Sequence, residues 1–146
     1  MAVVGVGIDV VHVPGFAEQL AQPGTTMLSS FSPAERRDAA GDVRSLAARW
    51  AAKEAVFKAF SSGFYAQRPA EKEVGAREVE VVSDAWGRPA VRVYGRIAAD
   101  LGPGATIHVS LTHDGDTAAA FAVIERTYQA RRSERAVSRY RTEPKG

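Results

Sequence analysis

Cysteine is absent from the 146-residue chain, so disulfide bridges and thiolate metal sites are excluded. No apolar run approaches the ~18 residues that are needed to cross a bilayer. The first residues show neither a basic leader nor a small-residue cleavage site, so we expect no signal peptide and a cytoplasmic protein without membrane partners. The fold must therefore be held by an ordinary hydrophobic core.

Two common nucleotide-binding motifs are also missing. The chain contains no GxxxxGK[ST] sequence, and Gly5-Val6-Gly7 lacks the third glycine and the following helix of a dinucleotide-binding fingerprint. His12 and His108 fall on expected strands without ligand spacing, so a zinc site is not indicated. Any anion site in the body of the chain must therefore be a local cluster of charged groups.

The charge of the chain is distributed unevenly. The net charge is +2, but residues 126–146 hold seven Lys or Arg and two Asp or Glu, a net +5, which leaves −3 on residues 1–125. Because 45% of the chain is hydrophobic, we expect one globular domain, 1–125, followed by a basic, flexible tail, 126–146. Such a tail attracts phosphates without sequence preference, so no specific nucleic-acid partner is expected.

Strand and helix signals alternate along the domain and predict an α+β fold with antiparallel strands. A helix is expected to begin at Ser32-Pro33-Ala34-Glu35. Serine is expected as the N-cap residue and glutamate as the third residue of the helix, which together form a capping box. Turns rich in glycine and aspartate join two pairs of strands as hairpins. The expected strands are 3–13, 77–83, 90–94, 106–113 and 117–125, and the other expected helices are 14–22, 43–60 and 95–101; a polar loop is expected at 64–76.

Asp9 is the most informative residue of the first strand. Alternation places Val4, Val6, Ile8 and Val10 on one face and Gly5, Gly7 and Asp9 on the other. Glycine leaves room beside Asp9 for another backbone or a ligand. A carboxylate in a valine-rich strand is costly unless it is paired, hydrogen-bonded or bound to a metal. The competing interpretation is an aspartate at a strand end that accepts a hydrogen bond from a nearby backbone N–H.

The segment RWAAKEAVFKAF, residues 49–60, places four charges on an alanine-rich helix. Glu54 and Lys58 have the i, i+4 spacing of an ordinary ion pair; alternatively, Glu54 binds a cation and Lys58 a phosphate. Arg49 and Lys53 repel each other at the same spacing unless an anion or an acidic partner lies near them. Carboxylates and cations together suit Mg²⁺ holding a phosphate ester with few protein ligands.

His113 stands at the end of an expected strand, directly before the Asp114-Gly115-Asp116 turn. Strand ends and loops are where sites are usually built. The competing interpretation is a histidine that only supports the turn. No nucleophilic triad is indicated, because Ser110 and Thr112 fall within the strand.

Four stretches, in this order, resemble the holo-[acyl-carrier-protein] synthases, the small bacterial-type branch of the 4′-phosphopantetheinyl transferases. They are GVGIDVV, RWAAKEAVFKAF, the GRP turn at 87–89 and HVSLTHDGDTAAAFAVIE, and the resemblance spans residues 3–125. It implies an antiparallel sheet packed against a long helix and a homotrimer with active sites between subunits. It also implies an activity: transfer of the 4′-phosphopantetheine arm of coenzyme A to a serine of apo-acyl carrier protein, which releases adenosine 3′,5′-bisphosphate, in fatty acid biosynthesis.

The resemblance also implies roles for particular residues. Asp9 and Glu54 would bind Mg²⁺, Lys58 would contact the pyrophosphate, and His113 would complete the catalytic set beside the phosphates. For the serine proton the acceptor is left open among Glu54, a metal-bound water and Asp114. The residues expected around coenzyme A are Arg49, Lys53, Lys58, Gly87, Arg88, Pro89, Thr112, His113 and Asp114, with Gly87-Arg88-Pro89 on the adenine side.

The chain departs from the family pattern in two places. Many relatives have an arginine near position 15 that meets the acidic carrier protein, whereas Pro14-Gly15-Phe16 supplies no charge. The usual glycine after the long helix is replaced by Ser61-Ser62. A nucleic-acid-binding module, suggested by the tail, and an inactive scaffold of the same fold are the alternative functions; the intact Asp9, Glu54, Lys58 and His113 argue against the scaffold.

Overall fold

The computed structural model of the protein describes residues 1–64, 66 and 74–127. The expected tail, apart from its first two residues, and much of the expected loop at 64–76 lie outside this part. In chain order the elements are β1 (Ala2–His12), α1 (Val13–Ala21), η1 (Met27–Ser30), α2 (Pro33–Ala39), α3 (Val43–Ser62), η2 (Ala76–Glu78), β2 (Val79–Ser83), β3 (Pro89–Val93), α4 (Gly95–Leu101), β4 (Ala105–Asp114) and β5 (Thr117–Arg126).

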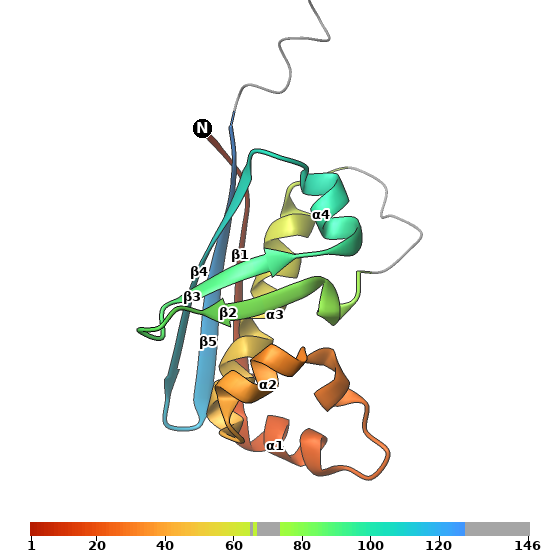
Figure 1. Ribbon diagram of the computed structural model, residues 1–146, viewed down its shortest axis with the longest axis vertical. Helices are drawn as coiled ribbons and strands as arrows, with labels where there is room; N and C mark the ends of the chain where they lie inside the picture. The colour runs from red at the N-terminus through yellow and green to blue at the C-terminus, as the bar shows by residue number, and fades with distance from the viewer. Residues whose placement is uncertain (65, 67–73, 128–146) are drawn as a thin grey trace, which may run out of the picture.

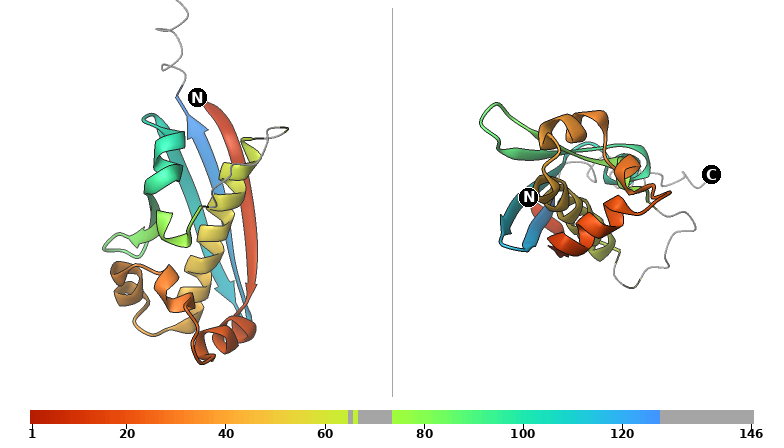
Figure 2. Two further views of the ribbon diagram at one scale, coloured as in Figure 1. Left: turned by 90° about the vertical axis from the view of Figure 1, so that its right-hand side faces the viewer. Right: turned by 90° about the horizontal axis from the view of Figure 1, so that it is seen from below.

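The three long strands form one antiparallel sheet in the order β1-β5-β4, and β2 and β3 form a separate hairpin. The long helix α3 lies along one face of the three-stranded sheet, closest to β1 and β5 (Figures 1 and 2). The hairpin contacts both α3 and β4. The predicted α+β class and the antiparallel pairing are thus confirmed, and none of the described helices is long and apolar enough to span a membrane.

Two glycines of β1 let α3 approach the sheet at backbone distance. A Cβ added to Gly5 would lie 1.8 Å from the carbonyl oxygen of Ala59, and one added to Gly7 would lie 1.9 Å from that of Ala55. Both alanines are almost completely buried. The room that the sequence left for a backbone or a ligand is therefore filled by a helix backbone.

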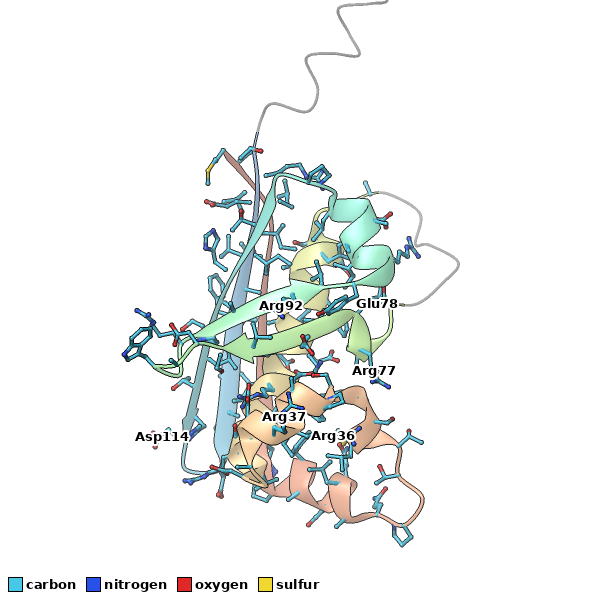
Figure 3. The ribbon with its side chains drawn as sticks, in the orientation of Figure 1. Arg36, Arg37, Arg77, Glu78, Arg92 and Asp114 are labelled. Carbon is cyan, nitrogen blue, oxygen red and sulfur yellow. The ribbon has the colours of Figure 1, made fainter. Side chains whose placement is uncertain are left out.

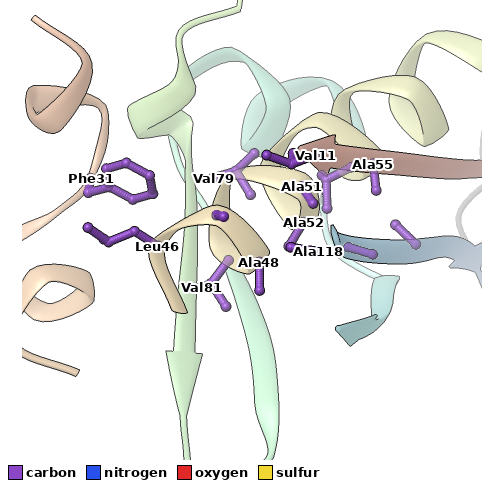
Figure 4. Close-up of a cluster of buried hydrophobic side chains, with 14 of the residues drawn as sticks. Val11, Phe31, Leu46, Ala48, Ala51, Ala52, Ala55, Val79, Val81 and Ala118 are labelled. Carbon is purple, nitrogen blue, oxygen red and sulfur yellow. The ribbon is translucent and has the colours of Figure 1, made fainter. Parts of the chain in front are cut away.

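The core forms where α3 meets the sheet and the hairpin. Alanines of α3 pack with Val11, Val79, Val81 and Ala118, and Phe31 closes one end (Figure 4). Small side chains on the helix allow this packing because they hold the layers close together. The opposite face of β1 stays outside the core: Val6, Ile8 and Val10 are 52%, 61% and 64% exposed.

A buried ion pair joins α2, α3 and β2. The Lys53 ammonium lies 2.9 Å from Glu35 Oε1, and both side chains are fully buried. Lys53 also donates to the carbonyl oxygens of Ala76 and Val79. Glu35 in turn accepts from the backbone N–H groups of Ser32 and Val81. Burial lowers the pKa of Lys53, and the hydrogen bond and charge of Glu35 oppose that shift.

Most element boundaries agree with the sequence within two residues. Ser32 caps α2 with the predicted capping box to Glu35, and α3 runs two residues beyond the expected end. The expected strand 77–83 begins later, because Ala76–Glu78 form a 3₁₀ turn. Glu78 accepts the N–H groups of Gly75, Arg96 and Ile97 there, which draws this segment toward α4.

We predict that Gly7→Ala strongly lowers stability, by about 2–3 kcal/mol or more, because the added methyl group meets the α3 backbone and one of the two layers must shift. Gly75→Ala is a matched control: its φ is −81°, and an added Cβ has its nearest neighbour at 3.9 Å. Thermal and urea unfolding compare the two. An unfolding midpoint for Gly7→Ala equal to that of the control would contradict the proposed close approach.

Candidate active site

A cleft of about 670 Å³ opens where the end of β1, α1 and the middle of α3 meet. Its lining combines aromatic rings with carboxylate and amide side chains. The lining residues are Asp9, Val10, Val11, His12, Gly15, Phe16, Glu18, Gln19, Gln22, Trp50 and Glu54. Of the sequence candidates, Asp9 and Glu54 therefore share one cleft.

Asp9 points from β1 toward α3 and is mostly buried. Its Oδ1 lies 2.9 Å from the ammonium of Lys58, which also donates to the Ile8 carbonyl oxygen at 2.9 Å. The Asp9 side chain is 17% exposed, and that of Lys58 is 54% exposed. Lys58 thus pairs with the strand carboxylate rather than forming the expected i, i+4 pair with Glu54, and this contact links β1 to α3.

Glu54 is half-buried beside this ion pair. Burial raises the pKa of Glu54, the negative charge of Asp9 raises it further, and Lys58 opposes both effects. Two carboxylates that raise the free energy of each other's charged forms are suited to share a cation. Within the described residues no three His, Cys, Asp or Glu side chains are grouped closely enough to hold a metal. A cation here would need water or substrate oxygens as further ligands, which suits Mg²⁺.

The α1 wall of the cleft was not predicted. His12 caps α1 by accepting the Gly15 N–H at its Nδ1, and Glu18, Gln19 and Gln22 follow at helical spacing. Glu18 and Gln22, the C-cap residue, are neighbours at i, i+4 spacing, and Gln19 lines the cleft beside them. The polar residues of this short helix were the signal that could have pointed to the wall.

Lys53 does not reach the cleft. It was expected among the coenzyme A contacts, but its ammonium is enclosed by Glu35 and two backbone carbonyl groups in the core. A fully buried lysine with three acceptors has no hydrogen left for a ligand. The sequence left open what offsets the repulsion between Lys53 and Arg49. The structure shows that Lys53 forms an ion pair with Glu35.

Arg49 is buried but incompletely satisfied. Its guanidinium donates from one terminal nitrogen to the carbonyl and hydroxyl oxygens of Ser45, one turn earlier. Its Nε has no hydrogen-bond partner among the residues that the structure describes. It is not among the residues that line the cleft. A buried cation with a free donor is the kind of group that an anionic ligand would satisfy.

His113 and its neighbours lie two strands away from Asp9. In the sheet register Val11 pairs with Ala118, which pairs with His113, so β5 separates the two sites. Thr112, His113 and Asp114 are exposed at the end of β4. Because successive strand residues face opposite sides, Thr112 and His113 cannot serve the same side of the sheet. None of the three lines the cleft.

The turn at 87–89 projects from the sheet edge at the tip of the β2–β3 hairpin (Figures 1 and 2). Asp84 fixes it: this carboxylate accepts the N–H groups of Trp86 and Arg88 and pairs with the Arg88 guanidinium at 2.6 Å. Arg88 lies 5.1 Å from the centre of the Trp86 ring, which is 80% exposed. Gly87 has a φ of +79°, which explains the glycine.

The model of the 4′-phosphopantetheinyl transferase superfamily matches residues 5–124. The chain belongs to this superfamily. Holo-[acyl-carrier-protein] synthase of Mycobacterium sp. (strain KMS) is 61% identical over 129 residues, which cover 86% of this chain and 98% of that protein. The resemblance drawn from the four sequence stretches is confirmed.

Two solved structures agree with this membership in the phosphopantetheinyl transferases. The acyl carrier protein synthase of Mycobacterium tuberculosis matches with a TM-score of 0.73 and 55% identity, covering 86% of this chain and all of that one. The ACPS–CoA complex of Chronobacterium ammoniagenes matches with a TM-score of 0.79 and 42% identity, covering 87% and 99%. The fold of this transferase chain is that of the synthases it resembles.

We predict that Glu54→Gln raises the thermal stability of the metal-free protein at neutral pH. The folded-state pKa of Glu54 lies above its ordinary value of 4.5, so the folded protein is destabilised by ionisation of this group as pH rises through that window. Glutamine removes the penalty, and the gain should vanish as pH falls toward 4.5. Unfolding midpoints measured with a chelator from acid to neutral pH test this.

Glu18→Gln is the control for this stability measurement, because it removes a carboxylate from the same cleft at an exposed position of α1. A gain from Glu54→Gln that grows toward acid pH, or an equal gain from Glu18→Gln, would contradict the proposed repulsion between Asp9 and Glu54.

Proposed function

We propose that the chain transfers the 4′-phosphopantetheine group of coenzyme A to a serine of apo-acyl carrier protein in the cytoplasm, releasing adenosine 3′,5′-bisphosphate. The observation that carries this proposal is that Asp9 and Glu54 line one cleft, with Lys58 paired to Asp9, in a chain of this superfamily. The superfamily is named after 4′-phosphopantetheinyl transfer. The cleft supplies carboxylates that can bind a metal ion and accept a proton, as such a reaction needs.

Asp9 and Glu54 are the proposed Mg²⁺ ligands. Their fit rests on two hard oxygen donors in a half-buried setting where one exposed lysine offsets two negative charges. When bound, Mg²⁺ supplies positive charge that stabilises the pyrophosphate oxygens as the phosphate bond breaks. The rest of the proposed chemistry belongs to side chains of the protein.

Lys58 is the proposed contact to the pyrophosphate. Its flexible stem already holds an ammonium at the mouth of the Asp9 site, and that ammonium can exchange the carboxylate for a phosphate oxygen. Glu54 accepts the proton of the attacking serine directly or through one water. Its position beside Asp9 in the cleft supports this role.

The remaining expected contacts to coenzyme A come from a second copy of the chain in this proposal. The turn at 87–89 projects away from the cleft of its own chain, and His113 is separated from Asp9 by β5. Ile8 and Phe121 are register partners on the outer face of the sheet and are 61% and 45% exposed. With Val6 and Val10 they form an apolar face that suits burial between subunits of a homotrimer.

We predict that the wild-type protein, incubated with apo-acyl carrier protein, coenzyme A and Mg²⁺, adds the mass of one phosphopantetheine group to the carrier. Asp9→Asn should lower the rate at least a hundredfold, because one of two metal ligands loses its charge. Asp38→Asn, an exposed position of α2, is the control. Intact mass spectrometry of the carrier is the measurement.

The same assay separates the roles of Lys58 and Asp9. Lys58→Met should slow transfer yet tighten Mn²⁺ binding without coenzyme A, measured by calorimetry, because the lysine no longer competes for Asp9. No mass gain with wild-type protein, where a known transferase succeeds, would exclude the proposed reaction. Weaker Mn²⁺ binding by Lys58→Met would exclude the proposed exchange of partners.

We predict that Ile8→Glu dissociates the homotrimer and abolishes transfer, because a charge on the apolar outer face cannot be buried without a partner. Thr106→Glu, exposed on β4 and directed to the same outer side, is the matched control. Light scattering at micromolar concentration measures the assembly. A wild-type monomer that is fully active would contradict the shared site.

A further inference from the structure

The wall of the cleft that is formed by β1 and α1 offers no cation to a protein substrate. Among the described residues, the carboxylates that line the cleft are Asp9, Glu18 and Glu54, and Lys58, on α3, is paired with Asp9. The first Lys or Arg of the sequence is Arg36, so β1, α1 and η1 hold none. A protein substrate that presents carboxylates would therefore need cations from another element.

Three arginines lie at the junction of α2 and α3. Arg36 and Arg37 stand in the last turn of α2, and Arg44 stands in the first turn of α3; all three are exposed. We call these three residues the arginine corner. Figure 3 shows Arg36 and Arg37 on α2, below the hairpin.

The arginine corner is connected to the cleft by packed aromatic rings. Arg36 Nε donates to the Phe31 carbonyl oxygen at 3.2 Å. The Phe31 ring lies 6.1 Å from that of Trp50 and 6.3 Å from that of Phe16, and both of these line the cleft. Along α3, Arg44 precedes Glu54 by ten residues, which is about 15 Å of helix. A small protein bound at the corner can therefore extend a loop to Glu54.

The charges of the corner are largely available to a partner. No carboxylate of the described residues forms an ion pair with Arg36 or Arg37. Arg44 pairs with Asp42 at 3.5 Å, with both side chains about half exposed, and an exposed pair of this kind is weak. Cations also complement the dipole at the end of α2, but that effect does not need Arg44 at the start of the next helix.

We propose that the arginine corner is the docking surface for the carrier protein, which presents carboxylates to it. This proposal rests on the proposed transfer reaction. It assigns docking to α2 and the start of α3, and it gives α1, whose charged residue is Glu18, no part in attracting the carrier. Charges at such a surface act mainly on encounter and on affinity for the protein substrate.

The test compares steady-state kinetics of Arg37→Gln/Arg44→Gln with those of Arg92→Gln, an exposed arginine of β3, using an apo-acyl carrier protein that the wild type modifies. We expect the double variant to raise the KM for the carrier about tenfold or more, with kcat and the KM for coenzyme A within about twofold. The control should leave all three unchanged. Arg36 is spared because it also bonds Phe31.

Salt gives a second measurement that does not depend on a variant. For the wild type, kcat/KM for the carrier should fall as NaCl rises, because exposed charges are screened, and the double variant should show a weaker dependence. An unchanged KM for the carrier, an equal effect of Arg92→Gln or a salt-independent wild type would overturn the docking assignment. A wild type that transfers nothing would instead overturn the proposed reaction.

Discussion

The arrangement of the site depends on the backbone contact between β1 and α3. Gly5 faces Ala59 and Gly7 faces Ala55, so two residues along the strand match one turn of the helix running the other way. The spacings agree physically, since two strand residues span about 6.8 Å and four helix residues about 6 Å. Continuing the pattern, Asp9 meets the next turn of α3, where Glu54 and Lys58 can reach it. Because Gly5 and Gly7 lack side chains, the Asp9 carboxylate of β1 can lie close to the Glu54 carboxylate of α3.

The buried pair of Lys53 and Glu35 sets the rotation of α3 about its axis. Adjacent helix residues point about 100° apart, so a helix that directs Lys53 toward α2 and β2 directs Glu54 toward β1 and the cleft. The pair is fully enclosed and its hydrogen bonds are satisfied, and removing one partner of such a pair is strongly destabilising. A rotation that exposed Lys53 would also turn Glu54 away from Asp9. The two neighbouring charges of the motif therefore serve different parts of the molecule.

Local patterns in the sequence were enough to predict the elements and the cap of α2, whereas the meeting of Asp9 with Glu54 was implied by the family resemblance. The patterns were not enough for Lys53, because its spacing from Arg49 left both an anion and an acidic partner open. The partner is Glu35, which stands 18 residues away and was recognised only as part of a cap. The Lys58 pairing was missed for the same reason: an i, i+4 partner is visible in sequence, and a strand partner 49 residues away is not. Sequence spacing predicts contacts within one helix or strand. Contacts between elements depend on how the elements pack, which spacing does not show.

The separation of the remaining site residues follows from the topology. Since β5 lies between β1 and β4, residues at the end of β4 are separated from β1 by two strand spacings, about 9–10 Å. The hairpin leaves the sheet on the β4 side, so its rigid tip, with Trp86 held over Arg88, also points away from the cleft. In the proposed function, a single copy therefore carries two parts of a phosphate site, and different neighbouring copies complete them. In a cyclic assembly such parts meet because each site combines one part from one copy with the other part from its neighbour. Burial of the apolar outer face of β1 and β5 would favour that assembly.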